Sequence, residues 1–572
     1  MAKRYRPVER DQAFLFPPDM REWLPADHRV HLVIRVVEEH LDTSAFHALR
    51  RTGGAGAAGY DPDMLVTVLV WAYAHQVTSS RRIEQLRGTD VAFRLICAGS
   101  LPDHVTIARF RAAFPGPAAE LFAQVLGLCA ALGMGKLGVV ALDGTKVAAS
   151  AGKAANRAED KLRQMAAESV ARHGETDAAE DTLFGDGSRG DEVPPDAWSP
   201  RDRDSRIAAA LAGLQAEREA AARQRTKTED EHLAGAAAGK PRPGSRPAGA
   251  DVALAEMAVE RARAAYQAKT EVRQAREAAA GKKLPGARAV PPGRYVRVRE
   301  AEAKLERARQ RQAAAAARAA EKEKNRAGPG PVRNITDPDS RLMPVRGGGF
   351  IQGYNAQVVT SSDGLIIATR LTATTGDTTW FTPMLQAAQD AAALITARHP
   401  LRSHDHDSGS GDDAAGRSGA DGDAACAGPI GLILADAGYC SEDNLTAPGP
   451  DRLIATGKLR ALVKAARGDP AEGSPAGKAA RAMAARLQTA DGIDAYRHRG
   501  HIAETPNGNI KHNKAFRHFS MRGKPKASSE WEFITTTTNL FKAISSGHLT
   551  HAALDALDGR AGRPASPAGT PA

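Results

Sequence analysis

The first 130 residues carry apolar positions at helical spacing. The segment Asp63–Val77 is almost continuously apolar and is long enough to form a buried helix. A further helix is predicted over Leu101–Phe114, where Asp103 stands at the position of an N-terminal cap. The pattern predicts a helical N-terminal domain over residues 1–130.

Two short apolar runs farther along the chain each end in an aspartate. The runs Val139–Leu142 and Gly431–Ala435 have strand length, and Asp143 and Asp436 follow them directly. Ligand-binding and catalytic groups of α/β proteins gather at strand ends, where the chain leaves the core. We therefore expect each strand to deliver a carboxylate at its end. An aspartate after a strand is also a common turn former or helix cap, so this alternative stays open.

A hairpin and a helix are predicted between these two runs. Strands are expected at Ile351–Thr360 and Leu365–Ala373, joined by the turn sequence SSDG. A helix should follow over Trp380–Ala397, with Asp377 as its cap, and a closing helix is expected over Glu530–Ser545. These elements together indicate the α/β class.

Residues 151–330 differ in composition from both flanks. They are rich in Ala, Arg, Glu, Lys and Gln, and Gly/Pro-rich breaks at 238–251 and 278–294 cut them into long pieces of high helix propensity. A helical hairpin or coiled coil, inserted between strand-forming regions, fits this pattern best. Residues 401–428 read as a disordered acidic linker and residues 555–572 as a disordered tail.

Composition narrows the protein class. The net charge of +11 and the pI of about 9.5 favour an anionic partner. The four cysteines form no CxxC pair, which argues against a disulfide framework and a structural zinc site. No apolar run reaches the roughly 18–20 residues that span a bilayer, and the charged start lacks the apolar segment of a secretory signal. We expect a cytoplasmic protein without membrane contact.

One carboxylate, Glu504, lies in a stretch that is otherwise basic. Seven Arg, Lys or His residues surround it within residues 496–514. Glu504 is either a counter-charge in a nucleic-acid-binding patch or a third acid beside Asp143 and Asp436. Carboxylates that lie close together repel unless a cation neutralises them, and oxygen ligands favour Mg²⁺ or Mn²⁺. Two further acids compete for the third position or support the site: Asp337 and Asp339.

In their chain order, these motifs resemble those of DDE transposases of bacterial insertion sequences, in the group with a Tyr-Arg-Glu-Lys signature. The resembling stretches are LDGTKVAAS, TDPDSRLM, GYNAQVV, LADAGY and YRHRGHIAETPNGNIKHN. RYRPVERDQAFLFPPDMREWLPADH and LPDHVTIARFR look like the N-terminal domain of the same transposases. The resemblance covers nearly the whole chain except the linker and tail. It implies an RNase H-like mixed-sheet catalytic domain, split over residues 131–150 and 331–545.

The resemblance also implies the site residues. Asp143, Asp436 and Glu504 match the catalytic triad, which would hold two Mg²⁺ or Mn²⁺ ions. The remaining signature positions, expected to contact DNA, are matched by Tyr496, Arg499 and Lys511.

The spacing within the signature departs from its commonest form. Four residues, one more than usual, separate Arg499 from Glu504, which leaves Arg497 as the alternative arginine. Glu504 and Lys511 keep the expected spacing of two helical turns and can share a face. Pro506 predicts that a helix starts there, with Thr505 as its cap.

Further basic residues should extend a track of phosphate contacts. Those after the signature and beside the first aspartate are Lys146, His512, Lys514, Arg517, Arg522, Lys524 and Lys526. A structural or solvent-facing role is equally open for Lys146. In the predicted helix 101–114, Arg109 and Arg111 are expected on an exposed face. The short helices there fit either a helix-turn-helix DNA reader or a plain helical bundle.

As a function, the resemblance implies metal-dependent cleavage of DNA at element ends and strand transfer into target DNA. The implied partners are terminal inverted repeats, target DNA and a second copy of the chain, with the protein on the nucleoid. One alternative is a catalytically inactive or domesticated RNase H-fold DNA-binding protein, and another is a coiled-coil assembly protein. The sequence does not choose between dimerisation, end binding and synapsis as the role of the insertion.

Overall fold

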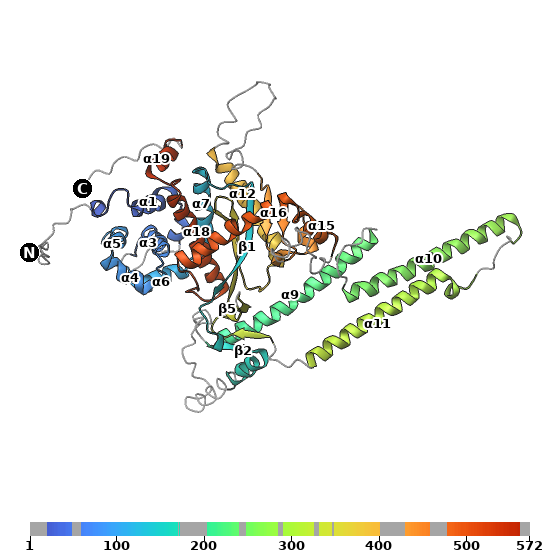
Figure 1. Cartoon of the computed structure of the whole chain (residues 1–572). Coiled ribbons are helices and arrows are strands. Elements are labelled where there is room, and N and C mark those ends of the chain that lie inside the picture. Colours follow the sequence, from blue (N-terminus) through green and yellow to red (C-terminus); the bar gives the residue numbers. More distant parts are fainter. Residues whose placement is uncertain are drawn as a thin grey trace, which may run out of the picture. The chain divides into compact units, whose positions relative to one another are not determined.

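The chain forms two compact units. A computed structural model describes residues 20–48, 59–169, 171, 203–238, 247–283, 290–324, 331–345, 348–400, 429–457 and 477–560. The first unit consists of Met1–Ala155 and Asp339–Ala572 and contains the main sheet. The second unit, Asn156–Pro338, consists mainly of long helices (Figure 1).

A six-stranded mixed sheet lies at the centre of the first unit. Its strands are β1 (Val139–Ala148), β4 (Arg341–Pro344), β5 (Phe350–Ser361), β6 (Ile366–Thr372), β7 (Leu432–Ala435) and β8 (Asp451–Ile454). The strand order is β4-β5-β1-β7-β8, and β4 and β6 pair with successive parts of β5. β5 is antiparallel to β1. On the other side of β1, β7 is parallel to β1 and β8 is parallel to β7. The predicted hairpin is confirmed as β5 and β6.

β1 is longer than its apolar run predicts. The strand continues beyond Val139–Leu142 to Ala148, because β5 pairs with it on one side over nearly its whole length. Asp143 therefore lies within the strand, and the expectation that it lies at the strand end is wrong. On the other side, β7 ends at Ala435, opposite Leu142. Asp143 is thus the first residue of β1 without a partner in β7.

The two faces of the sheet pack against different helices. Val140 and Leu142 enter a large core on one face, whereas Ala141 and Leu434 enter a smaller core on the other. Because side chains alternate along a strand, Asp143 lies on the same face as Ala141. The helices of the large core include α7 (Pro117–Ala131), α12 (Phe381–Arg398) and α18 (Lys524–Ser545). Those of the smaller core include α15 (Lys478–Arg486) and α16 (Ala490–Arg499).

Short helices before the sheet share the large core. They are η1 (Met20–Trp23), α1 (Arg29–Arg35), η2 (Val36–His40), α2 (Ser44–His47), α3 (Pro62–Ala74), α4 (Ser80–Thr89), α5 (Val91–Cys97) and α6 (His104–Ala112). The predicted buried helix is confirmed as α3, although it ends at Ala74. The predicted start of α6 is also confirmed, because the Asp103 side chain accepts from the Thr106 amide. On α3, the Tyr73 ring packs edge-on against Phe533 of α18.

Arg111 is buried, contrary to the expectation that it is exposed. Only 7% of the residue is accessible, and its guanidinium donates to the Tyr73 hydroxyl and to Ser80 Oγ. The Tyr73 hydroxyl in turn donates to Glu530 Oε1 of α18 at 3.1 Å. Arg111 therefore belongs to an internal polar network between helices, whereas Arg109 is exposed as expected.

Two expectations for the C-terminal part need correction. α18 begins at Lys524 rather than at Glu530. A further helix, α19 (His551–Arg560), runs into the first part of 555–572, which the sequence suggested to be a disordered tail. The rest of that tail and the predicted linker 401–428 lie outside the described residues.

Asp377 does not cap the helix that follows it. It precedes a short 3-10 turn, η6 (Thr378–Trp380), and its side chain makes no capping hydrogen bond. Its carboxylate instead accepts from the side-chain amides of Asn355 and Gln357 at 2.7 and 2.8 Å. Both amides are buried on β5, and a buried donor needs an acceptor. The predicted helix itself is confirmed as α12.

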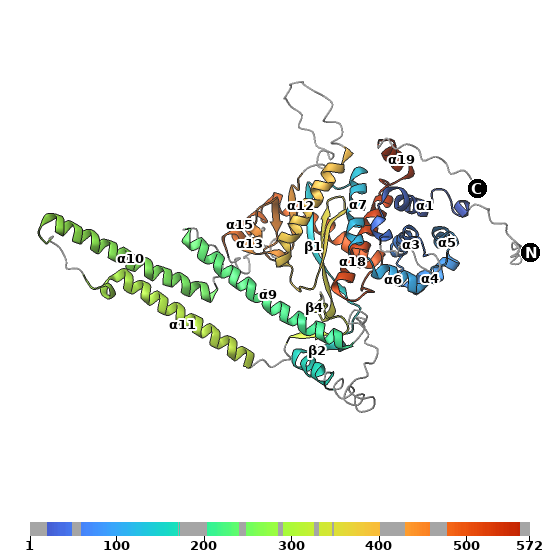
Figure 2. The same ribbon diagram turned by 180° about the vertical axis from the view of Figure 1, so that it is seen from behind.

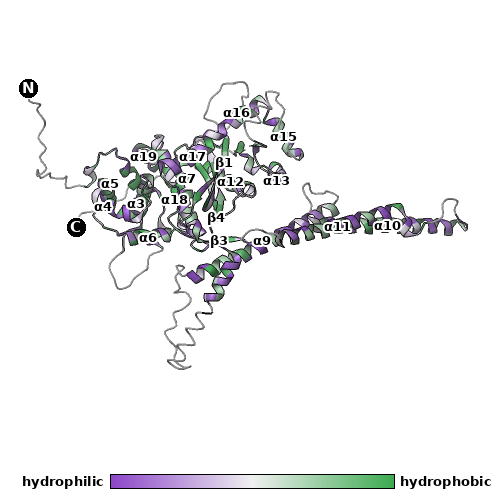
Figure 3. Cartoon of the chain, turned by 60° about the horizontal axis from the view of Figure 1, so that its bottom comes forward, coloured by the Kyte–Doolittle hydropathy of each residue, from purple (hydrophilic) through white to green (hydrophobic). Residues whose placement is uncertain are grey.

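The second unit contains the long helices α9 (Arg203–Ala237), α10 (Ala248–Ala280) and α11 (Val296–Lys324). The predicted Gly/Pro-rich breaks separate them. α10 and α11 lie side by side as the expected hairpin (Figure 2), with ion pairs Arg263–Glu302 and Arg309–Glu256 at 2.9 and 3.0 Å. Hydrophilic and hydrophobic residues alternate along both helices (Figure 3), and the buried side chains of Val259 and Val298 and the Tyr266–Tyr295 ring contact add apolar packing. A small ladder of β2 (Asn156–Ala158) and β3 (Val332–Asn334) completes this unit.

Among the described residues, no single helix is both long enough and apolar enough to cross a bilayer. The bent pair of α6 and α7 passes that test only when the two helices are combined, by length and composition.

The burial of Arg111 leads to a stability prediction. Arg111→Ala should lower the free energy of unfolding by about 2–4 kcal/mol, because it leaves buried acceptors on Tyr73 and Ser80 without their donor. Arg109→Ala removes an exposed guanidinium from the same helix and should change it by less than about 0.5 kcal/mol. Urea unfolding of the two variants tests this contrast, and equal stabilities would contradict it.

Candidate active site

The sheet brings the two predicted aspartates to neighbouring positions. Leu142 of β1 pairs with Ala435 of β7 in the last rung of the parallel ladder, and Asp143 and Asp436 are the next residues on each chain. Ala141 and Leu434, two residues earlier on each strand, both face the smaller core. The strand alternation therefore directs Asp143 to this face, and Asp436 leaves β7 beside it.

The helix over this face supplies a guanidinium between the acids. Arg499, the last residue of α16, is 8% accessible and lies 2.9 Å from Asp143 Oδ1. It is 3.9 Å from Asp436 Oδ2 and 3.9 Å from Glu504 Oε1. The structure thus brings all three predicted acids around one arginine. The alternative arginine, Arg497, is exposed.

A π-helical turn absorbs the extra residue of the signature. Residues Gly500–Glu504 form a π-helix, η9, between α16 and the short helix α17 (Thr505–Gly508). In an α-helix, at about 100° per residue, the fifth residue after Arg499 would point about 140° away from it. The i→i+5 bonding of a π-turn returns Glu504 to the side of Arg499.

Helical structure continues through the proline. Pro506 lies in the first turn of α17, as expected, but it follows η9 without a break. Thr505 has helical dihedral angles and belongs to α17, so the expectation that it caps a new helix is wrong. A second π-helix, η10 (Asn509–Asn513), follows directly. Such π-turns are frequent at functional sites.

Asn507 is a site residue that the sequence analysis missed. Its Nδ2 donates to Asp143 Oδ2 at 3.2 Å, while Arg499 donates to Oδ1. Both oxygens of Asp143 are therefore held, one by each side chain. Asn507 is three residues after Glu504, and this helical spacing was the only signal that pointed to it.

Burial and charge together perturb the ionisable groups here. Burial is the main reason that the pKa of Asp143 rises to about 6, while Arg499 opposes the rise and Asp436 and Glu504 add to it. Burial also raises the pKa of Tyr496 to about 12. Three carboxylates thus lie around one guanidinium, with Asp143 mostly buried, Asp436 partly exposed and Glu504 exposed, and such a cluster of like charges attracts a cation.

The three carboxylates of the site are suitable ligands for hard divalent cations. All three predicted ligands are carboxylates, which suit Mg²⁺ and Mn²⁺. Among the described residues, two groups have three ligand atoms within 4.8 Å of one another: Glu39, His40 and Asp558, and His47, Asp61 and Asp63. The triad is not one of these groups, so its carboxylates lie farther apart than the ligands of a single compact site.

Several residues expected to contact DNA are used inside the protein. The buried Tyr496 donates its hydroxyl to the Ala435 carbonyl at 3.1 Å, which ties α16 to the end of β7. Lys514 is 5% accessible and lies 5.1 Å from the centre of the Phe541 ring. Lys146 donates to the Pro344 carbonyl at 2.8 Å. Tyr496 and Lys514 are therefore buried, contrary to the accessibility that their expected DNA contacts require. For Lys146 the DNA-contacting and structural roles both stay open.

Other predicted basic residues remain accessible. Lys511 is half-buried and donates to the Lys146 carbonyl at 2.9 Å. Burial lowers the pKa of Lys511, while the negative charge of Asp143 partly raises it again. Five exposed residues of the predicted phosphate track follow the site: His512, Arg517, Arg522, Lys524 and Lys526. These side chains give the region after Glu504 an accessible positive charge.

The two competing aspartates do not join the triad. The Asp339 carboxylate accepts from the Lys524 amide at 2.8 Å and so caps the start of α18. Asp337 is fully buried in the second unit, where its backbone amide donates to the Asn334 side chain.

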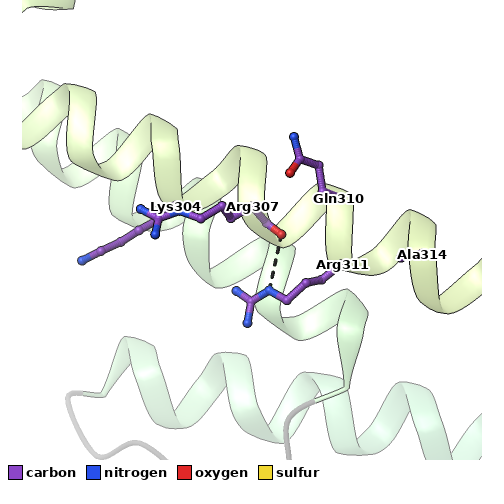
Figure 4. Close-up of a pocket in the computed structure, with 5 residues that line it drawn as sticks. All are labelled: Lys304, Arg307, Gln310, Arg311 and Ala314. Carbon is purple, nitrogen blue, oxygen red and sulfur yellow. Dashed lines mark hydrogen bonds between the residues drawn. The ribbon is translucent and has the colours of Figure 1, made fainter.

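A pocket on α11 of the second unit is lined by Lys304, Arg307 and Arg311 (Figure 4). Its lining includes no carboxylate that could bind a metal ion.

Two family models match the chain. Residues 18–113 match the model described as Transposase domain (DUF772), and residues 468–544 match the model described as Transposase DDE domain. The second match includes Arg499, Glu504 and Asn507, whereas both aspartates lie outside either match. No curated protein and no solved structure matches the chain.

The burial of Lys514 leads to a prediction about pH. Burial lowers its pKa to about 8, so between pH 8 and 10.5 the unfolded chain holds a proton that the folded protein has lost. Stability should therefore rise with pH through this window, by up to about 3 kcal/mol. Lys514→Met keeps an apolar contact with the Phe541 ring and should remove this rise.

Urea unfolding at pH 7.5 and pH 10 measures the effect as a difference between variants. The matched control is Lys526→Met, which removes an exposed lysine and should follow the wild type at both pH values. A parallel pH dependence of wild type and Lys514→Met would contradict the prediction.

Proposed function

We infer that this chain, which belongs to the DDE transposases of insertion elements, cleaves DNA at the ends of its element and joins the freed ends to target DNA. The observation that supports this most strongly is the convergence of Asp143, Asp436 and Glu504 around Arg499. These residues come from β1, the end of β7 and the π-turn η9, which are far apart in sequence. Such convergence of acids has no structural need in a plain DNA-binding domain.

The proposed chemistry follows from the carboxylates. Two Mg²⁺ or Mn²⁺ ions bound by the triad would promote attack by water or by a DNA 3′-hydroxyl and stabilise the leaving oxygen. Asp143, Asp436 and Glu504 would hold the ions, and of the three only Asp143 is mostly buried. Arg499 and Asn507 hold the two oxygens of Asp143, which fixes the plane of its carboxylate.

The accessible basic residues suit binding to the DNA backbone. His512, Arg517 and Arg522 follow the site, and Lys511 lies between them and β1. Phosphate contacts of this kind make binding strongly dependent on salt. Arg109 on α6 offers a separate exposed guanidinium within the matched N-terminal domain. We assign these residues to the DNA-binding surface.

Three structural proposals accompany this function. We propose that the mixed sheet is an RNase H-like core. Asp143 lies on its central strand β1, and Asp436 follows β7, which is the parallel neighbour of β1. Residues 1–130 would bind DNA, and the protein would act on the nucleoid as a homodimer, since both ends of an element must be cut. The long helices within 151–330 would serve as an accessory module of this enzyme.

Removing each carboxylate tests the proposal. Asp143→Asn, Asp436→Asn and Glu504→Gln should each reduce Mg²⁺-dependent cleavage of a plasmid that carries the gene and its flanking DNA by at least about 10³-fold. Each change preserves shape and removes a charged metal ligand. Binding to the flanking DNA should change by less than about threefold.

The matched control is Asp494→Asn, an exposed acid on α16 that should leave cleavage unchanged. Full activity of any triad variant would remove that residue from the site. If the wild-type protein binds the flanking DNA but does not cut it under any divalent-cation condition, the alternative of a catalytically inactive or domesticated DNA-binding protein is favoured.

A further inference from the structure

A chain of buried hydrogen bonds links β5, the strand paired with that of Asp143, to the loop of Asp436. The Tyr439 hydroxyl, three residues after Asp436, donates to Gln357 Oε1 on β5. Gln357 Nε2 donates at 2.8 Å to Asp377 Oδ1, and Asn355 Nδ2 donates at 2.7 Å to the same oxygen. Asn355, Gln357 and Tyr439 are at most 1% accessible.

Asp377 lies against the backbone of both aspartate-bearing segments. A methyl group added at Gly144, the residue after Asp143, would lie 2.6 Å from Asp377 Oδ1. One added at Gly438, two residues after Asp436, would lie 3.2 Å from Asp377 Oδ2. Glycine at both positions allows the same carboxylate to approach the two segments closely.

Neighbouring contacts fasten the Asp436 loop to the segment of Asp377. Thr378 Oγ1 donates to the Gly438 carbonyl at 2.7 Å. Asn444, at the start of α13 (Glu442–Thr446), donates to the carbonyls of both Thr378 and Tyr439 at 2.8 Å. The segment of Asp377 is therefore bonded to the Asp436 loop on one side and to β5 on the other.

This contact compensates for the limited pairing of β7. The ladder between β1 and β7 ends at Leu142 and Ala435, so no backbone pair holds Asp436 relative to Asp143 beyond that rung. β5, in contrast, is paired with β1 through Asp143 and beyond. A side chain that links β5 to the loop after β7 can fix the separation of the two aspartates where the backbone ladder does not.

We propose that Asp377 is a positioning residue, whose Oδ1 anchors the Asp436 loop through Gln357 and Tyr439 and so sets the distance between Asp436 and Asp143. The inference rests on the proposed function, because that distance matters for binding two divalent ions. Asp377 acts through other residues and is not itself a ligand of the ions.

Two substitutions separate the hydrogen bonds of Asp377 from its charge. Asp377→Ala removes the acceptor and leaves the buried amides of Asn355 and Gln357 without it. Asp377→Asn removes the charge but keeps an oxygen that can accept from both amides. A positioning role therefore predicts a severe loss in the alanine variant and rescue by asparagine.

The first measurement is Mg²⁺-dependent cleavage by the full-length protein. Asp377→Ala should reduce the cleavage rate at least about 100-fold and raise the Mg²⁺ concentration for half-maximal rate about tenfold, with flanking-DNA binding within about threefold of wild type. Asp377→Asn should stay within about tenfold of wild type. An equal loss in both variants would overturn positioning in favour of direct metal binding by the carboxylate.

The second measurement does not depend on activity. Calorimetric titration of the protein with Mn²⁺ should show affinity about tenfold weaker for Asp377→Ala than for wild type. Unchanged affinity overturns the inference even if cleavage is lost, and wild-type protein that neither cleaves DNA nor binds Mn²⁺ overturns the proposed function and the inference with it.

The matched control is Asp363→Ala. Asp363 lies in the β5–β6 turn and accepts from the backbone amides of Gly135 and Lys136, which precede β1. Its replacement by alanine therefore also removes two hydrogen bonds. We expect this variant to lower the melting temperature without changing the Mg²⁺ dependence. A change in Mg²⁺ dependence equal to that of Asp377→Ala would show that the effect of the latter is general destabilisation, and would overturn the inference.

Discussion

The site depends on where the parallel ladder between β1 and β7 stops. Pairing of Leu142 with Ala435 fixes the relative position of the two strands, and the next residues of both are Asp143 and Asp436. A slip of one residue would move one carboxylate to the opposite face of the sheet, into the large apolar core. The apolar residues of both strands therefore hold the acids together, although none of them is part of the site.

Bringing carboxylates together on a covered face has an electrostatic cost that the protein offsets locally. Burial and the two neighbouring acids favour the neutral form of Asp143, and Arg499 and Asn507 counteract this by binding its two oxygens. A buried guanidinium that lost its carboxylate partner would destabilise the fold by about 3–5 kcal/mol. Arg499 and the triad therefore depend on one another, so the site and the fold of α16 are coupled.

The sequence predicted the parts of this arrangement that local pattern controls. The apolar runs, the β5–β6 hairpin, α12 and the cap at Asp103 follow from spacing and turn chemistry, and the structure contains them. Local pattern could not predict that Asp143 lies within β1. The strand extends to Ala148 because β5 pairs with it there, and not because of the residues of β1 themselves. The burial of Arg111 and Lys514 depends likewise on distant helices, and helical spacing alone does not show which face a neighbour covers.

The π-turn explains how the signature tolerates an additional residue. An insertion in a regular α-helix rotates everything after it by about 100°, which would carry Glu504 away from the aspartates. A π-turn confines the extra residue to one widened turn, so α16 before it keeps its packing through Tyr496 and Glu504 keeps its place beside Arg499. The proline after the turn has no amide hydrogen to bond, which favours a change of hydrogen-bonding pattern at this point. Spatial convergence, not residue count, therefore favours Arg499 over Arg497 as the arginine beside Glu504.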